Sequence, residues 1–399
     1  MPKFLAVDFY CGAGGTTRGL LNADGYVIAG IDNDVDCQET YQHNNINSTL
    51  DAAVPAFLAN DMFPSSVEYP QGQQHEVMAK LGELIPRYRE AAKNVPLMFA
   101  ICAPCQSFNK FVQRRLTEGR ISGRDREQDL LAQTLGFIER FQPEMIVSEN
   151  VATIRRGRYR RVWESFQLAL RGLGYVVGED TVCASRFGVA QRRRRSILLA
   201  YRSQHGLNPI FNPPIPYRDP EASQISTHDA IGHLPSLQAG ESRDGIPNHV
   251  CRNLTEINRW RLMSVKPGEP NFGFAKSEFG DLSLECHRRL RDEGKTGFGD
   301  VYTRMHPDRP APTITTRFHS VSNGRFGHYD VSQVRALSLR EGAALQSFSD
   351  DYEFFGSGMD IIAKMIGNAV PPKLSAFMAG WVFGLWNDTA SDLKLSLGG

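Results

Sequence analysis

Two residues of reactive type stand at the ends of apolar runs that predict strands. Cys105 comes after Pro104, directly behind the run 97–102, and Glu149 closes the run 145–148. Because the carboxyl ends of neighbouring parallel strands meet at one edge of an open sheet, we expect the thiol and the carboxylate to converge on one cleft. A thiolate attacks an electrophilic carbon, and a carboxyl group holds or donates a proton. The pattern therefore predicts nucleophilic chemistry by Cys105.

A glycine-rich turn and two acidic strand ends predict a cofactor site. The turn, residues 10–15, follows the predicted strand 3–9 and lacks the glycine spacing of the dinucleotide fingerprint. Asp32 closes the next strand and could accept from ribose hydroxyls, and Asp61 could accept from an adenine amino group. A phosphate-free adenosine cofactor, S-adenosylmethionine, fits this set because no Walker-type Gly-Lys-Ser/Thr occurs. A plain strand–helix turn for the glycines, and helix capping for the acids, remain the alternatives.

Arginine is concentrated in three stretches, although the chain carries a formal net charge of only +1. The stretches are residues 105–126, 155–161 and 192–195, each just after a predicted active-site strand or leading into one. A single cluster of this kind is usually solvated surface. Three such clusters favour a phosphate backbone as the ligand.

The first 200 residues alternate strand-like and helix-like patterns. The predicted strands are residues 3–9, 27–31, 97–102, 145–149, 175–182 and 196–201. The predicted helices are residues 16–23, 34–44, 76–93, 127–141 and 159–172. This alternation predicts an α/β fold in which helices cover both faces of a mostly parallel sheet.

Composition changes near residue 203, and we expect three regions. Residues 1–203 form the catalytic and cofactor-binding domain. Residues 204–335, rich in Gly, Pro, His and Asn, form a smaller irregular domain. Helical patterning returns at 338–346 and 361–385, so residues 336–399 are expected to be a hinge and a return to the first domain.

The bulk composition narrows the class of protein. At 399 residues, 41% apolar and 22% charged, the chain has the proportions of an ordinary globular protein with two or three domains. We expect no signal peptide and no membrane span, because the uncharged apolar stretches are too short. Seven scattered cysteines indicate a reducing cytoplasm. No second Cys-x-x-Cys and no spaced histidine pair completes a zinc site, so we expect no metal.

Five motifs occur in the order seen in DNA (cytosine-5)-methyltransferases, and the chain resembles the bacterial or phage type of that family. They are Tyr10-Cys11-Gly12-Ala13-Gly14-Gly15, Pro104-Cys105-Gln106, Glu149-Asn150-Val151, Gln191-Arg192-Arg193-Arg194-Arg195 and Gly367-Asn368-Ala369-Val370-Pro371. The segment 340–346 also resembles the penultimate motif of the family. Three mild departures are Tyr10 for phenylalanine, Asn60 for glycine before Asp61, and Cys102-Ala103 for Gly-Pro before Pro104.

The resemblance implies an S-adenosylmethionine-dependent methyltransferase with a Rossmann-like sheet and assigns site residues. The implied catalytic residues are Cys105, which adds to carbon 6 of cytosine, Glu149, which holds the ring, and Arg193 and Arg195, which bind the carbonyl of the base and support Glu149. The implied cofactor-binding residues are Tyr10, Gly12, Gly14, Gly15, Asp32, Asn33, Asp61, Met62, Pro104, Asn368 and Val370. The expected DNA contacts are Gln106, Lys110, Arg114, Arg115, Arg120, Arg124, Arg304, Arg317 and Arg325.

The same resemblance implies how the DNA substrate is bound. The target cytosine must leave the duplex to be reached, and the segment 107–126 is expected to close over it while its cations track phosphates. The irregular domain is expected to read a short site in double-stranded DNA from the major groove. A restriction–modification or phage-defence role, with a cognate endonuclease or defence proteins as partners, follows for an enzyme at the bacterial nucleoid.

Three other functions remain open from the sequence. Cys102 and Cys105 form a Cys-x-x-Cys, which can be a redox pair or bind a metal. An RNA cytosine-5 methyltransferase acting on tRNA is possible chemically, although the Cys-Phe-Thr segment characteristic of those enzymes is absent. A catalytically silent DNA-binding protein on the same fold is the third, and the presence of Cys105, Glu149 and Arg193 disfavours it.

Overall fold

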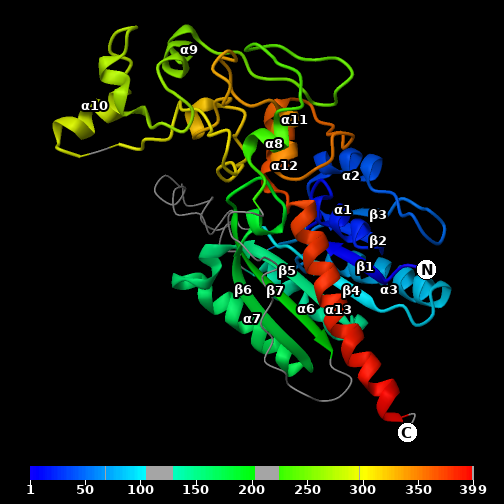
Figure 1. The fold of residues 1–399 in the computed structure, drawn as a ribbon. Coiled ribbons are helices and arrows are strands. Elements are labelled where there is room, and N and C mark those ends of the chain that lie inside the picture. Colours follow the sequence, from blue (N-terminus) through cyan, green and yellow to red (C-terminus); the bar gives the residue numbers. More distant parts are fainter. Residues whose placement is uncertain (68, 105–128, 203–223, 296, 398–399) are drawn as a thin grey trace. The chain divides into compact units, whose positions relative to one another are not determined.

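A seven-stranded sheet forms the centre of the first half of the chain (Figure 1). The computed structural model describes residues 1–67, 69–104, 129–202, 224–295 and 297–397. The strand order is β3-β2-β1-β4-β5-β7-β6. The first five strands in this order run parallel, whereas β7 is antiparallel to both β5 and β6. The predicted mostly parallel sheet is therefore confirmed.

The strands agree closely with the predicted ranges, with one addition. They are β1 (Phe4–Phe9), β2 (Gly25–Asp32), β3 (Ala56–Ala59), β4 (Leu97–Ile101), β5 (Met145–Val151), β6 (Tyr175–Cys183) and β7 (Arg194–Arg202). The sequence pattern did not predict β3, which has four residues, is only partly buried and shows no alternation. Such a short edge strand carries little local signal.

The helices fall into those that pack on the sheet and those of the irregular region. The first group is α1 (Gly15–Asn22), α2 (Gln38–Asn44), α3 (Gln74–Ala91), α5 (Leu130–Gln133), α6 (Leu135–Phe141), α7 (Arg160–Gly172) and α13 (Pro372–Leu397), with the 3-10 turns η1 (Val35–Cys37), η4 (Ala152–Arg155), η5 (Gly157–Tyr159) and η6 (Ala184–Phe187). The second group is α8 (Thr227–Ile231), α9 (Glu256–Met263), α10 (Glu285–Asp292), α11 (Leu339–Leu345) and α12 (Met359–Asn368), with η7 (Asn271–Lys276) and η8 (Val321–Asn323).

Helices cover both faces of the sheet, as alternation along the strands requires. Leu5, Val7 and Phe9 of β1 belong to the core that includes residues of α3, α6 and α7. Successive strand residues point to opposite faces, so Asp8 points the other way, toward α1. On that second face α13 packs along α1, β5 and β7. All residues of β1 are buried, and the sheet is therefore a rigid support for whatever its carboxyl edge carries.

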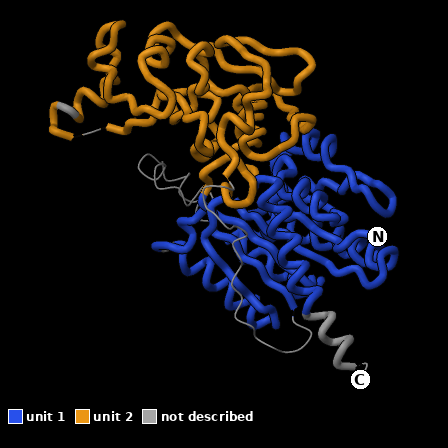
Figure 2. The backbone as a smooth tube through the Cα atoms, in the orientation of Figure 1, with its two compact units in different colours: residues 1–183, 194–216, 370–399 blue, residues 184–193, 217–369 orange. Residues whose placement is uncertain are grey.

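The chain divides into two compact units (Figure 2). Unit 1 comprises residues 1–183, 194–216 and 370–399, and unit 2 comprises residues 184–193 and 217–369. Among the described residues, this division differs from the expected boundaries in two places. Residues 184–193 group with unit 2, and so do residues 336–369, which we expected to return to the first domain.

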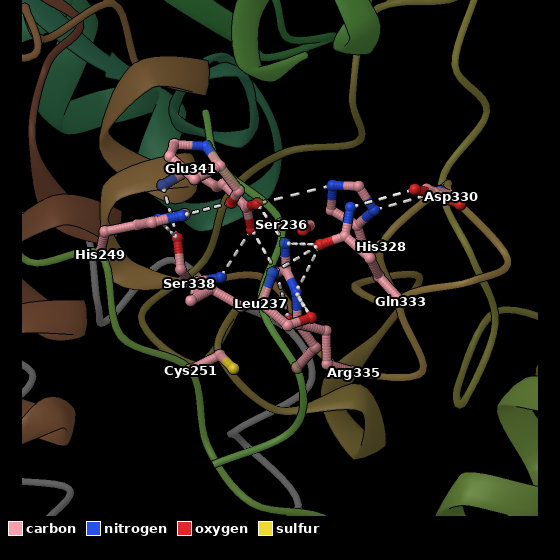
Figure 3. Close-up of polar contacts among 12 residues, drawn as sticks. Ser236, Leu237, His249, Cys251, His328, Asp330, Gln333, Arg335, Ser338 and Glu341 are labelled. Carbon is pink, nitrogen blue, oxygen red and sulfur yellow. Dashed lines mark hydrogen bonds and ion pairs between the residues drawn. The ribbon is translucent and has the colours of Figure 1, made fainter. Parts of the chain in front are cut away.

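Unit 2 has short helices and isolated bridges, and its interior is held by buried polar contacts (Figure 3). The fully buried Arg335 forms a bidentate ion pair with Glu341, with N–O distances of 2.6 and 2.8 Å. Glu341 in turn completes a capping box with Ser338 at the start of α11. Nδ1 of His249 lies 3.0 Å from the Ser338 hydroxyl, and Nε2 of His328 lies 3.5 Å from Oε1 of Glu341. Such satisfied networks fix one arrangement of an otherwise irregular region.

The charge of Glu341 is stabilised by this network. Burial alone raises the pKa of a carboxyl group, but the Arg335 guanidinium and the neighbouring groups together outweigh it and lower the pKa of Glu341 to about 2. Burial lowers the pKa of His328 to about 4, so this imidazole is neutral at pH 7. In the described part of the chain, no helix is both long and apolar enough to cross a membrane.

Candidate active site

Glu149 and Arg195 form an ion pair at the carboxyl edge of the sheet. Val151 of β5 lies opposite Arg195 of antiparallel β7, which places Arg195 diagonally next to Glu149 on one face. Arg195 Nε lies 2.7 Å from Glu149 Oε1, and the two side chains are only 10% and 9% exposed. The approach falls outside hydrogen-bond geometry, so Oε1 has no hydrogen-bond partner among the described residues. The pair thus holds a carboxylate and a guanidinium together, largely shielded from water, at this edge of the sheet.

The end of β4 is tied to β5 on both sides of Glu149. The Ser148 hydroxyl donates to the Ile101 carbonyl at 2.6 Å, and the Asn150 amide donates to the Ala103 carbonyl at 3.2 Å. All four groups are at least partly buried, so the contacts are protected from water. The chain that continues to Pro104 is therefore fixed beside Glu149. Sequence reasoning did not assign this role to Ser148 or Asn150, whose small polar type inside an apolar strand was the available signal.

Cys105 lies outside the described residues, and Pro104 is the last described residue before it. The same holds for the expected DNA contacts Gln106, Lys110, Arg114, Arg115, Arg120 and Arg124. Their roles stay predictions. What the structure supplies is the anchored strand end from which Cys105 follows.

Cys102, the other thiol of the Cys-x-x-Cys, is held in its protonated form. Burial raises its pKa well above the ordinary value, and the nearby carboxylates of Glu149 and Asp8 raise it further. A thiol that keeps its proton is a poor nucleophile and a poor metal ligand. Among the described residues there is also no group of three His, Cys, Asp or Glu that could hold a metal ion.

The glycine-rich turn adopts the backbone that only glycine accommodates easily. Gly12 and Gly14 have φ of 49° and 89°, and Tyr10, with φ of 63°, is also left-handed. The Gly12 amide donates to Oδ2 of Asp32 at 2.8 Å, while Oδ1 of Asp32 accepts from the Asp34 amide at 2.9 Å. Asp32 thus orders the chain just after β2 and also holds the glycine turn. A Cβ on Gly12 would meet open space, which leaves room for a ligand over the turn.

Asp61 is fixed by three donors. Its oxygens accept from the Phe63 amide at 2.8 Å, the Asn33 amide group at 3.1 Å and the Tyr69 hydroxyl at 2.8 Å. Tyr69 was not predicted as a site residue, and no sequence motif marks it. Met62 is buried in the core, so its side chain makes apolar contacts and no polar contact. The open glycine turn with two ordered carboxylates fits an adenosine ligand without phosphates.

Asp8 of β1 supports the glycine-rich turn through a contact with α1, the helix that follows the turn. The cap residue of α1 is Gly14, which has no side chain, and the first turn of α1 has no acidic residue. Instead Thr17 of α1 donates its hydroxyl to Asp8 Oδ2 at 2.7 Å. Burial raises the pKa of Asp8 to about 7, Thr17 lowers it and Asp32 raises it. This fully buried carboxyl group, which sequence reasoning missed, connects the sheet to the helix that follows the glycine turn.

Arg193 is surrounded by backbone carbonyls, and its expected role of binding the base stays a prediction. It lies in unit 2, is 3% exposed, and donates to the carbonyls of Ile314, Gly367 and Ala369 at 3.1 to 3.3 Å. Its two terminal nitrogens thus bind backbone carbonyls of unit 2. Of the two predicted catalytic arginines, the structure pairs only Arg195 with Glu149.

The remaining assignments in unit 2 and the final helix divide by burial. Arg304 is 1% exposed and donates to the carbonyls of Leu262, His328, Asp330 and Gln333, a buried setting that does not favour its predicted contact with DNA. Arg325 is bound to Asp300 and to the Gly268 carbonyl. Arg317 is exposed and stays a predicted contact. Asn368 ends α12 in unit 2 and Val370 begins the last segment of unit 1, and their cofactor roles stay predictions.

Comparisons with known proteins show which family the chain matches. The family model of the C-5 cytosine-specific DNA methylase matches residues 87–383. M.HgiDII, a Type II methylase of Herpetosiphon aurantiacus, is 31% identical over 379 residues, which cover 94% of this chain and 93% of that protein. M.DdeI, a Type II methyltransferase of Desulfomicrobium norvegicum, is 25% identical over 429 residues, which cover 97% and 92%.

Solved structures share the fold. A protein described as a DNA modification methyltransferase encoded within an E. coli prophage superposes with a TM-score of 0.64 at 17% identity, covering 96% of this chain and 99% of that one. The Dnmt2 methyltransferase of S. pombe gives 0.51 at 15% identity, with the same two coverages of 96% and 99%. The Rossmann-like methyltransferase fold is thereby confirmed. Since the family model spans most of the chain and a relative matches it nearly end to end, this chain belongs to the C-5 cytosine-specific DNA methylase family and is a DNA cytosine methyltransferase.

Proposed function

We propose that this enzyme methylates carbon 5 of a cytosine within a short duplex site, by flipping the base and attacking it with Cys105. Carbon 5 of cytosine is a poor nucleophile on its own. Addition of the Cys105 thiolate to carbon 6 makes the ring an enamine, so carbon 5 can take a methyl group. Loss of the carbon 5 proton and of the Cys105 sulfur then restores the aromatic ring and the free thiol.

The observation that carries the proposal is the Glu149–Arg195 pair beside the anchored end of β4. The Glu149 carboxylate, held by Arg195, is suited to the N3 and amino edge of a flipped cytosine, where hydrogen bonding stabilises the attacked ring. Arg195 orients this carboxylate and offsets its charge. The Ser148 and Asn150 tethers keep the strand that leads to Cys105 at the position where both groups can meet one base.

S-adenosylmethionine is the methyl donor in this proposal. Bound over the glycine turn, it would supply the methyl group from its sulfonium to carbon 5, and S-adenosylhomocysteine would be left as the product. The turn at Gly12 leaves space, Asp32 has acceptor capacity for ribose hydroxyls, and Asp61 is held in place for the adenine. These residues bind and orient; none of them needs to change its protonation during the reaction.

A restriction–modification role is the biological setting that the relatives support. M.HgiDII and M.DdeI are named as Type II enzymes, and the chain covers more than nine-tenths of each. In this setting unit 2 reads the duplex site, a cognate endonuclease or defence proteins complete the system, and the enzyme works at the nucleoid in the bacterial cytoplasm. An RNA substrate is not favoured, since the matched family model is a DNA methylase.

The proposal is tested by expressing the chain in a host without cytosine methylation and sequencing bisulfite-treated host DNA. We expect one short motif to be protected at a single cytosine, and no protection when Cys105→Ala is expressed at the same level. Purified enzyme should transfer label from S-adenosylmethionine to duplex DNA and not to tRNA. Transfer to tRNA alone, or methylation by Cys105→Ala, would contradict the proposal.

A further inference from the structure

Three arginines project from unit 1 next to the strand that carries Glu149. β5 passes directly into η4 and η5, which lead to α7, and β7 starts at the same edge of the sheet. Arg156 follows η4, Arg161 is the second residue of α7, and Arg194 is the first of β7. All three are exposed. We name these residues, Arg156, Arg161 and Arg194, the arginine edge.

Strand register places Arg194 on the face of the sheet opposite the catalytic pair. Arg194 lies opposite Cys183 of β6, and Ser196 lies opposite Thr181, so these four side chains share one face. Arg155 reaches the same face, because it donates to the Thr181 hydroxyl at 3.0 Å and pairs with Glu179 at 2.9 Å. Glu149 and Arg195 occupy the other face. The arginine edge therefore flanks the site and is not part of the catalytic pair.

Local carboxylates do not neutralise the arginine edge. The ion pairs of this region bring Glu179 and Asp180 to Arg155, and Glu164 to Arg160. Those three acids are thus already engaged with other arginines. Arg156, Arg161 and Arg194 have no ion-pair or hydrogen-bond partner among the described side chains. Three uncompensated positive charges remain on this part of unit 1.

The backbone that displays these charges is anchored in the core. Ile154 and Trp163 are buried at 0% and 1% exposure, and Tyr159 is buried at 7%. Trp163 also donates its indole N–H to Glu179 at 2.8 Å. Arg156 and Arg161 therefore extend from a fixed backbone. Positive charges at the start of α7 do not stabilise this helix. Its first turn has no acidic residue to pair with them, and cations at a helix N-terminus oppose the helix dipole.

We propose that the arginine edge binds the phosphodiester backbone of DNA beside the flipped cytosine. The inference rests on the proposed function and deepens it, because it assigns a backbone contact to unit 1 in addition to the base-reading role of unit 2. Arginine suits phosphate oxygens, and contacts of this kind hold the duplex without reading its sequence. The arginine edge should therefore act on specific and non-specific DNA alike.

The test is the salt dependence of DNA binding by the variant R156Q/R161Q/R194Q. The probe is a labelled 30-base-pair duplex of arbitrary sequence, with binding followed by anisotropy at several NaCl concentrations. Removing one arginine–phosphate interaction makes the slope of log affinity against log salt shallower by about 0.9. For the triple variant we expect the slope to become shallower by about 2 to 3, with affinity weakened at least about tenfold at low salt.

The matched control removes three positive charges from the opposite edge of the sheet. R87Q/K93Q/R140Q changes exposed residues that precede β4 and β5, at the amino ends of these strands. This control should keep the wild-type slope, and both triple variants should bind S-adenosylmethionine as the wild type does. An unchanged slope in R156Q/R161Q/R194Q, or an equal change in the control, overturns the proposal. Absence of methylation by the wild type would overturn the proposed function instead, while the slopes would still decide the arginine edge.

Discussion

The expected role of Glu149 depends on the side chains around it more than on its being a carboxylate. With 9% of the side chain exposed and Arg195 at 2.7 Å, it is held as one oriented carboxylate. Removing its charge leaves Arg195 buried and unpaired, which is costly in a site closed to water. The residue should therefore matter for the chemical step more than for binding of the cofactor.

We expect Glu149→Gln to lower the single-turnover methylation rate by about 10²- to 10⁴-fold, because an amide neither donates an acidic proton nor pairs with Arg195. Its dissociation constant for S-adenosylmethionine, measured by calorimetry, should stay within about threefold of the wild type. Glu83→Gln, an equal change on exposed α3, is the control. A wild-type rate in Glu149→Gln would refute the assigned role.

Asp8 gives a prediction about pH. Its pKa is raised to about 7, so between pH 4 and 7 the folded protein holds a proton that the unfolded chain has released. Stability therefore falls as pH rises through this window, and the buried charge destabilises unit 1 above pH 7 by roughly 2–4 kcal/mol. Asp8→Asn should raise the thermal midpoint more at pH 8 than at pH 5. An equal shift at both pH values would show that Asp8 ionises normally.

Residue roles were only partly predictable from sequence, because type and spacing do not reveal burial. Glu149 and Arg195 were expected to lie together, and the structure pairs them. Arg193 and Arg304 are of the same residue type as Arg195, but backbone carbonyls surround both. Those carbonyls come from segments as far as 176 residues away, so no local pattern could identify them.

At the scale of elements, the site depends on the junction between the ends of β4 and β5. Ser148 and Asn150 share one face of β5 and hold the last residues of β4 through their carbonyls. Glu149, between them, points to the other face. The junction therefore fixes the carboxylate and the strand leading to Cys105 with respect to each other.

Asn150→Ala removes one tether, and we expect the single-turnover rate to fall about tenfold, since small misplacements of reacting groups are costly. Affinity for S-adenosylmethionine should not change, because the glycine turn lies on β1. The control is Ser196→Ala, which removes a buried hydroxyl from β7 opposite Asn150. This variant should keep the wild-type single-turnover rate. A normal rate in Asn150→Ala would mean that the Asn150 tether is not needed.

The elements themselves were largely predictable, because most strands and helices of unit 1, though not β3, have a clear period or apolar run. Strand direction was not. Residues 196–201 were expected as a strand, but nothing in their local sequence shows that β7 runs antiparallel. The helical run expected over 361–385 is two helices, α12 and α13, separated at Ala369–Pro371.

At the scale of the whole molecule, the two units differ in what holds them. Unit 1 is built on a sheet with an apolar core, and unit 2 on buried polar contacts such as Arg335–Glu341. Residues 184–193 join unit 2 because Gln191 donates to Gln346, 155 residues away, at 2.8 Å. Composition could not reveal this contact, and the expected boundary at residue 203 therefore differs from the observed one.

The neutral, buried His328 makes unit 2 sensitive to acid. Below pH 6.5 the unfolded chain binds a proton that folded His328, with a pKa of about 4, does not. Unit 2 should lose roughly 1–2 kcal/mol between pH 7 and 5, and His249, whose pKa burial also lowers, acts in the same direction. Glu341 does not contribute, because its charge is lost only at lower pH.

The measurement is hydrogen exchange of peptides from residues 324–345 at pH 7 and pH 5, corrected for intrinsic rates. His328→Asn, which keeps an acceptor for the Asp330 amide, should lose less protection than the wild type. Equal losses in both proteins would assign the acid sensitivity elsewhere.

We propose that Cys105 adds to carbon 6 of a cytosine taken out of the duplex. This is tested by replacing the target cytosine with 5-fluorocytosine. A base can remove a proton from carbon 5 but cannot remove fluorine, so the covalent adduct between Cys105 and the base is retained. With S-adenosylmethionine present, the account predicts a protein–DNA complex that survives denaturation and maps to Cys105 by peptide mass spectrometry, and none with Cys105→Ala. Release of the protein on denaturation, or attachment at another residue, would contradict the account.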